Sequence, residues 1–167
     1  MENRTFGIVI PELAECSRKA AAEGAVLLKN EDGVLPFRKE ECISVFGRIQ
    51  FDFYRSGTGS GGAVNAPFIK NLVDGFRENQ NLCINEELVS IYETWRKDHP
   101  VDDGGGVWAG EPWNQADMDL TPEIVRAARE KSEKAVYVIG RTAGEDKDNT
   151  MEEGGYCLTA QEKKNLE

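Results

Sequence analysis

The chain has 167 residues, and 40% of them are hydrophobic, which is the length and apolar content of one ordinary globular domain. Thirty acidic residues against 20 basic ones give a net charge of −10. Nucleic acids and anionic membranes both require clustered positive charge, which this acidic chain lacks, so we expect neither as a partner.

Two further classes are disfavoured by simple patterns. The start "MENRTFGIVIPE" has no basic flank and only a short apolar run, and no segment approaches the ~20 apolar residues of a membrane span, so we expect a cytoplasmic protein. The four cysteines include no C-x-x-C pair and have no neighbouring histidine. We therefore expect no zinc site, no redox dithiol and no cofactor.

The first third of the chain predicts a helix followed by strands. Residues 13–23 are good helix formers and end at Gly24, a typical residue at a helix C-terminus. The stretch "AVLLKNEDGVLPF" predicts a short strand, a turn at Asp32-Gly33 and a second apolar segment. "CISVFG", residues 42–47, is apolar on both faces, which predicts a central strand of a parallel sheet.

The middle of the chain predicts two helices around a short strand. Residues 68–79 carry apolar side chains at helical spacing, residues 81–85 form a candidate strand, and residues 86–96 predict a second helix. From residue 97 to 120 the periodicity is lost and Gly, Pro and Asp accumulate around two tryptophans. We therefore interpret 81–120 as an insertion or lid.

The last third repeats the alternation. Thr121-Pro122 is a cap with a first-turn proline for a helix over residues 123–134, and "AVYVIG", residues 135–140, predicts a second buried parallel strand. Thr159 and Glu162 form a capping box for a further helix. Strands that alternate with helices predict an α/β fold, a layered α/β/α sandwich with a mostly parallel sheet, and the sheet looks truncated.

The acidic loop after residue 140 is the first candidate site. In parallel sheets ligands bind beyond the carboxyl ends of the strands, where the loops after Gly47 and Gly140 both lie. Glu145 follows the strand by five residues, and Gly144 before it frees the backbone to present the side chain. An acid in such a cleft can do acid/base chemistry. The alternative to a catalytic role, for any surface acid, is a solvated charge. The loop holds five acids: Glu145, Asp146, Asp148, Glu152 and Glu153.

The glycine run "SGTGSGG", residues 56–62, is the second candidate. It lacks the G-x-x-x-x-G-K-[ST] pattern and begins nine residues after Gly47, which argues against a phosphate site. We interpret it as a tight loop that lets backbone approach a neutral ligand or a neighbouring domain. His99, the only histidine, stands in a polar loop without a nucleophile beside it.

Three blocks of this sequence together resemble a known family. "AAAEGAVLLKNEDGVLPF", "ISVFG" followed by "GTGSGG", and "AVYVIGRTAGEDKDN" with "GGYCLTAQE" are similar, in that order, to the α/β sandwich domain of glycoside hydrolase family 3, the β-glucosidase family. The likeness covers about 13–79 and 123–167 and is weaker over 81–120.

The resemblance implies a retaining β-glycosidase, most closely a β-glucosidase, made of two domains. It implies an Asp nucleophile in a (β/α)8 barrel and a general acid/base in the sandwich domain. The family pattern G-E-x-x-D-R places that acid/base on Glu145 and its acidic neighbour on Asp148, whereas the family's arginine is replaced by Asn149. It also implies that the glycine-rich loop faces the substrate, a β-linked glycoside, with these residues: Arg55, Gly57, Thr58, Gly59 and Ser60.

The barrel and its nucleophile are absent from this sequence, so we expect residues 1–167 to be one partial domain of a longer protein, inactive alone. Met1 just before the first block favours a sandwich domain that precedes the barrel. The alternative function is a non-catalytic carbohydrate-binding or domain-contact module, and a weaker one is a flavodoxin-like nucleotide binder. An incomplete sheet leaves an open edge, which predicts self-association.

Overall fold

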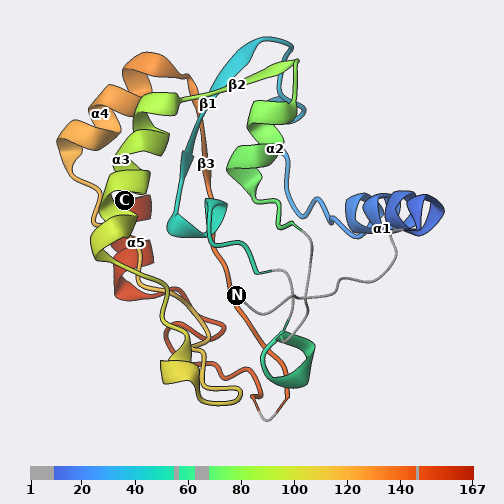
Figure 1. The fold of residues 1–167 in the computed structure, drawn as a ribbon. Helices are drawn as coiled ribbons and strands as arrows, with labels where there is room; N and C mark the ends of the chain where they lie inside the picture. The colour runs from blue at the N-terminus through green and yellow to red at the C-terminus, as the bar shows by residue number, and fades with distance from the viewer. Residues whose placement is uncertain (1–9, 55–56, 63–67, 146) are drawn as a thin grey trace. The chain divides into compact units, whose positions relative to one another are not determined.

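The computed structural model describes residues 10–54, 57–62, 68–145 and 147–167 (Figure 1). The chain divides into two compact units. The smaller comprises Met1–Phe37 and Asn65–Phe68, and the larger comprises Arg38–Val64 and Ile69–Glu167. Each unit is described by itself.

The smaller unit contains the helix α1, Pro11–Glu23, which confirms the predicted helix. A proline opens the helix, and the Gly24 N–H donates to the Ala20 carbonyl at 2.9 Å at its end. The turn at Asp32-Gly33 is present, with φ of 57° and 63°. The strand predicted before it is wrong: residues 25–30 have no regular structure, and Leu28 is 92% exposed. A strand is stable only against a partner, and no described residue pairs with this segment.

The larger unit is built on a parallel sheet of three strands, in the order β2, β1, β3. The central strand β1 is Glu41–Phe46, with β2, Leu82–Ile84, on one side and β3, Lys134–Tyr137, on the other. Three of the four predicted strands are thus confirmed, and Ile43 to Phe46 are fully or nearly buried as expected of a central strand.

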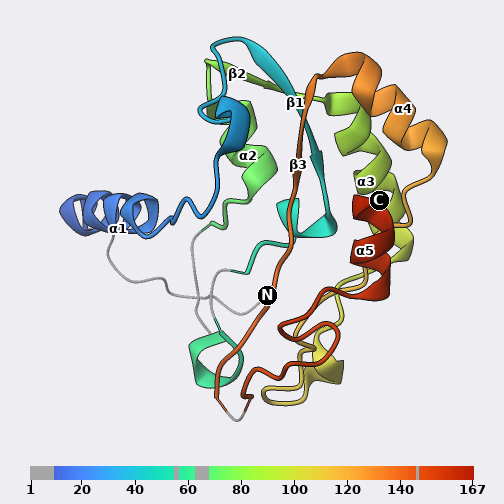
Figure 2. The ribbon, with the colours of Figure 1, turned by 180° about the vertical axis from the view of Figure 1, so that it is seen from behind.

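Helices cover both faces of this sheet, so the predicted layered α/β fold is confirmed. The helices α3, Glu86–Asp98, and α4, Pro122–Lys131, lie on one face together with α5, Ala160–Leu166, and α2, Leu72–Glu78, lies on the other (Figures 1 and 2). Successive side chains of β1 alternate between these layers. Phe46 packs with Leu88, Tyr92, Met118 and Ala128 in the core under α3 and α4.

Helix boundaries follow the capping residues. Thr121 and Thr159 accept from the third residue of α4 and α5, as their sequences predict. The predicted start of the helix at residue 68 is wrong by four residues. Asn71 forms a capping box with Asp74, so α2 begins at Leu72, and Phe68 and Ile69 stay outside it and are exposed.

The interval predicted as an insertion or lid contains regular and irregular parts. Its first part, β2 and α3, belongs to the sheet and one helical layer. Its second part, residues 99–121, has no helix or strand except one 3-10 turn, Gly104–Gly106. Buried Arg48 anchors this part by donating to the carbonyls of His99 at 2.8 Å and Ala116 at 3.0 Å.

Membrane-spanning helices and metal-binding clusters are both absent from the described residues. No helix in the ranges above has the length and apolar character needed to cross a bilayer. Within the same ranges no three His, Cys, Asp or Glu side chains gather in a way that would hold a metal ion. All four cysteines are free thiols, although parallel pairing of β1 with β2 brings the sulfur atoms of Cys42 and Cys83 within 3.0 Å.

Candidate functional site: the Glu145 loop and the glycine-rich loop

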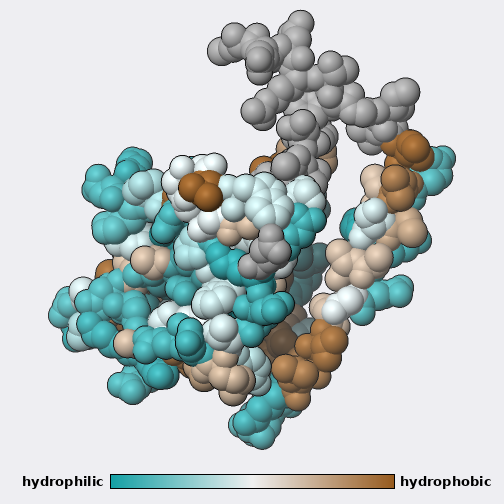
Figure 3. Space-filling view, turned by 90° about the horizontal axis from the view of Figure 1, so that it is seen from below, coloured by the Kyte–Doolittle hydropathy of each residue, from teal (hydrophilic) through white to brown (hydrophobic). Residues whose placement is uncertain are grey.

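The loops that follow β1 and β3 leave the sheet at the same edge. Gly47 ends β1 with φ of 90°, and a Cβ there would lie 2.4 Å from the Val138 carbonyl oxygen, so glycine is required for the strand ends to stay together. The polypeptide then continues into the glycine-rich loop after β1 and into the acidic loop after β3. Both lie at the lower end of the sheet in Figure 1, and this end, viewed head on in Figure 3, is mainly hydrophilic.

The two loops contact each other through their backbones. Thr58 and Gly144 form a parallel bridge, and the Thr58 N–H donates to the Ala143 carbonyl at 3.0 Å. A Cβ on Gly57 would lie 2.5 Å from the Ala143 oxygen, and one on Gly144 would lie 2.6 Å from the Thr58 nitrogen and carbonyl oxygen. The glycines are therefore needed because one loop lies directly against the other. The glycine run, which the sequence predicts to face a ligand or another domain, packs on the acidic loop of its own domain.

Glu145 is held by a single residue of the glycine-rich loop. The Ser60 hydroxyl donates to one carboxylate oxygen, Oε1, at 2.6 Å, and the Ser60 backbone N–H donates to the other, Oε2, at 2.9 Å. These two bonds, the hydroxyl first, lower the pKa of the exposed Glu145 carboxyl, with a small opposing effect of burial. The side chain is therefore fixed in position and ionised at neutral pH.

Gly59 completes the contact. It has φ of +77°, and a Cβ at this position would lie 2.6 Å from the Glu145 Oε2 atom. The loop thus contacts the carboxylate through its main chain and the Ser60 hydroxyl. Of the site residues predicted from the sequence, Gly57, Thr58, Gly59 and Ser60 are therefore brought together with Glu145.

Asp148 is the other predicted site residue that the structure describes, and it takes no part in the hydrogen bonds that hold Glu145. Asp148, which the sequence pattern places as a neighbour of the acid/base, is exposed, and so is Asn149. Arg55 and Asp146 lie outside the described residues. A bracing role for Asp148 stays a prediction.

Arg141 supports the acidic loop. Its guanidinium forms a two-pronged ion pair with Glu162 of α5, at 2.7 and 2.6 Å, and donates to the Gly155 carbonyl at 2.7 Å. Both side chains are largely buried. Burial raises the pKa of Glu162, but the bonds from Arg141 and the Thr159 N–H outweigh it, and the net pKa is lowered. Sequence reasoning found Glu162 only as a capping residue and missed Arg141, because their pairing depends on how α5 returns to the loop.

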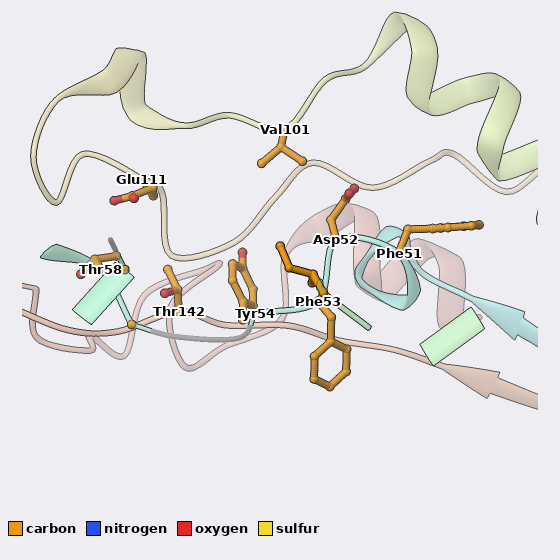
Figure 4. A pocket seen from close by; sticks show the side chains of 11 residues that line it. Phe51, Asp52, Phe53, Tyr54, Thr58, Val101, Glu111 and Thr142 are labelled. Carbon is orange, nitrogen blue, oxygen red and sulfur yellow. The ribbon is translucent and has the colours of Figure 1, made fainter. Parts of the chain in front are cut away.

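A cavity of about 380 Å³ lies beside the glycine-rich loop (Figure 4). Val101 and Glu111 of the irregular segment line one side, and Tyr54, Thr58 and Thr142 line the opposite side, whereas the Phe53 ring points away. The pKa of Tyr54 is raised, chiefly by burial. Glu145 is not among the residues that line this cavity.

Comparison with known proteins places this arrangement in a family. The sequence model of the glycosyl hydrolase family 3 C-terminal domain matches residues 25–164. The chain belongs to glycosyl hydrolase family 3. The resemblance read from the three sequence blocks is thereby confirmed.

Relatives in this family are β-glucosidases. The chain is 47% identical over 152 residues to a β-glucosidase of Ruminococcus albus, covering 91% of this chain and 16% of that protein. It is 34% identical over 138 residues to β-glucosidase A of Butyrivibrio fibrisolvens, covering 82% of this chain and 16% of that protein.

Solved structures of the family have the same fold. A β-glucosidase from Paenibacillus barengoltzii is 57% identical, with a TM-score of 0.93 over 97% of this chain and 17% of that one. β-Glucosidase 3B of Thermotoga neapolitana in complex with α-D-glucose is 26% identical, with a TM-score of 0.78 over 93% of this chain and 21% of that one. The chain therefore spans about a sixth to a fifth of the length of these relatives.

Proposed function

We propose that this chain is part of a retaining β-glycosidase, most closely a β-glucosidase, and that Glu145 is its general acid/base. One observation carries the proposal. A single carboxylate of the loop after β3 is held in place by the glycine-rich loop, at the sheet edge where ligands bind in parallel α/β folds. Membership of a family whose relatives are β-glucosidases supports the choice of reaction.

In this mechanism two carboxyl groups flank the glycosidic bond. Glu145 in its acid form donates a proton to the glycosidic oxygen while a carboxylate nucleophile attacks the sugar, and the leaving group departs as an alcohol. Glu145, now ionised, then removes a proton from the water that hydrolyses the glycosyl intermediate. The nucleophile comes from another domain, in our proposal a (β/α)8 barrel, which closes over the carboxylate.

The lowered pKa of Glu145 fits the second step better than the first. A general acid works best when its pKa lies near the working pH, and a carboxyl group reaches that value when it is desolvated. Exposed as it is here, Glu145 favours the ionised form. Closure of a second domain over the loop would remove water and raise this pKa, so the acid function requires that domain.

The test replaces the matching segment of the Paenibacillus barengoltzii β-glucosidase with this chain and compares the chimera with its Glu145→Ala variant. We expect kcat/KM on cellobiose, from which glucose departs as a poor leaving group, to fall by about 100-fold or more. An aryl glucoside with an activated leaving group should lose far less, and azide should restore part of the turnover. Glu152→Ala, on the same loop, is the matched control. An inactive chimera, or equal losses on both substrates, would refute the assignment.

The cavity beside the glycine-rich loop supports a second candidate, a non-catalytic carbohydrate-binding module. It is formed within the larger unit alone and is lined by aromatic, apolar and polar side chains, as sugar sites are. Titration of the 167-residue chain with glucose and cello-oligosaccharides discriminates the two candidates. A binding module binds alone, whereas half of a composite active site does not.

A further inference from the structure

We propose that Ser60 is a positioning residue that determines which oxygen of Glu145 carries the catalytic proton. The proposal rests on the function proposed for Glu145 and adds a second residue to it. Its basis is the difference between the two groups that Ser60 offers to the carboxylate. The backbone N–H contacts Oε2 and the hydroxyl contacts Oε1.

The backbone N–H of Ser60 can only donate. A proton on Oε2 would point at this N–H, and the N–H would then have no acceptor. Oε2 therefore stays unprotonated while the contact lasts. The hydroxyl can turn and either donate or accept. It therefore tolerates both protonation states of Oε1. Oε1 is accordingly the oxygen that holds the proton in the acid form and receives it in the base form.

The surrounding backbone keeps this assignment from exchanging. The Thr58 bridge to Gly144 holds the loops together, and Gly59 lies so close to the Glu145 side chain that a Cβ would come within 2.8 Å of its Cβ. A half-turn of the carboxylate only exchanges the names of its two oxygens, because one of them again lies beside the Ser60 N–H and the other beside the hydroxyl. The two oxygens are thus inequivalent in the folded chain.

The two reaction steps use the hydroxyl in opposite senses. In the first step the proton leaves Oε1 for the glycosidic oxygen, the bond from that oxygen to the sugar breaks, and the Ser60 hydroxyl then donates to the new carboxylate. In the second step Oε1 takes a proton from the attacking water, and the water oxygen bonds to the sugar carbon as the bond from that carbon to the nucleophile carboxylate breaks. The hydroxyl thus favours the ionised state, so its loss makes Glu145 a weaker acid.

Other charged groups near Glu145 are few among the described residues. Lys147 and Asp148 flank it in sequence, and the Lys147 ammonium turns away, toward the Glu111 carbonyl and the Trp113 ring. The effects on the pKa of Glu145 come from Ser60 and burial. A change of pKa in a Ser60 variant therefore reports the contact itself.

The experiment compares Ser60→Ala and Ser60→Thr, with Ser90→Ala on an exposed face of α3 as the control. Nuclear magnetic resonance titration of the Glu145 side-chain carboxyl in the 167-residue chain gives its pKa. The pH profile of kcat/KM in the Paenibacillus chimera gives the kinetic effect.

We expect Ser60→Ala to raise the pKa of Glu145 and to move the alkaline limb of the kcat/KM profile to higher pH. We also expect it to lower kcat by up to about 100-fold, as a misplaced catalytic group does. Ser60→Thr should restore both.

The outcomes separate the two proposals. An unchanged Glu145 pKa in Ser60→Ala would overturn the role of Ser60, whatever happens to catalysis. So would a loss of kcat that Ser60→Thr does not restore. A different outcome would refute the proposed function and leave the Ser60 contact standing. In that outcome Ser60→Ala raises the pKa of Glu145 but does not move the alkaline limb of the kcat/KM profile, and Glu145→Ala does not discriminate between leaving groups.

Discussion

Glu145 shows at the residue scale how main-chain geometry positions a carboxylate, here the one that we propose as the acid/base. Its two oxygens are bound by one serine, and the neighbouring glycines bring the loop to hydrogen-bonding distance without side chains in the way. A carboxylate on a flexible loop would sample many rotamers, and misplacement by about 1 Å is costly in catalysis. The glycine-rich loop therefore orders the carboxylate in the absence of substrate.

Gly59→Ala should disrupt this order, because the alanine would have to adopt the left-handed φ of +77° and its Cβ would lie 2.6 Å from Oε2 of Glu145. We expect a loss of about 1 kcal/mol in the free energy of unfolding from the backbone strain. We also expect a fall in chimera turnover on cellobiose, because the clash moves Glu145 off Ser60. Gly61→Ala is the control, since nothing lies within 4 Å of a Cβ there. Equal behaviour of the two variants in denaturation and turnover assays would contradict the prediction.

At the scale of elements, the ion pair between Arg141 and Glu162 joins the loop after β3 to α5. The same Glu162 carboxylate accepts from the Thr159 N–H at the start of that helix. One side chain therefore caps α5 and neutralises the arginine that holds the Gly155 carbonyl. Truncating either partner leaves a largely buried charge unpaired.

Glu162→Gln should lower the free energy of unfolding at pH 7 by about 2 kcal/mol, less than a fully buried pair because the site is partly solvated. The folded-state pKa of Glu162 is below its ordinary value. The contribution of ionised Glu162 to the free energy of unfolding is therefore complete above that ordinary pKa. It is lost as the pH falls through the pKa of the folded state. Urea denaturation of wild type and variant at pH 7 and pH 3 should show a difference that shrinks at pH 3. Glu130→Gln, exposed on α4, is the control, and a difference independent of pH would contradict the ion-pair account.

The whole molecule leaves interaction surfaces in both units. In the larger unit β3 pairs only with β1 among the described residues, so β3 is an edge strand of the sheet. In the smaller unit Val26, Leu27 and Leu28 are 76%, 62% and 92% exposed. Hydrophobic surface of this extent is typical of a segment that contacts another part of a protein.

The open edge of β3 predicts self-association of the 167-residue chain. We expect Ala135→Lys, an exposed position on β3, to reduce it, because a charge on an edge strand opposes pairing with a second edge. Gel filtration with light scattering over a range of concentrations measures the effect, with Ser90→Lys on α3 as the control. A monomer at every concentration in the unmodified chain would contradict this prediction.

The sequence predicted regular structure best where local signals agree with tertiary packing. "CISVFG" is apolar on both faces, and Thr121 and Thr159 are good capping residues, so β1, α4 and α5 were expected close to where they are found. "AVLLK" carries the same apolar signal without a pairing partner and is not a strand. Local apolar composition indicates a preference for burial, whereas a strand also requires a neighbouring strand with which it can form hydrogen bonds.

The amino-acid sequence by itself determined the α/β alternation and the family and predicted Glu145 among five acids, because these depend on residue types and spacings along the chain. Only the tertiary structure decided what contacts Glu145. Ser60 is 85 residues away, and the pairs Arg141 with Glu162 and Cys42 with Cys83 depend likewise on strand order and on the return of α5. Hydrogen bonds act over about 3 Å, so they are set by how distant segments meet and not by local pattern.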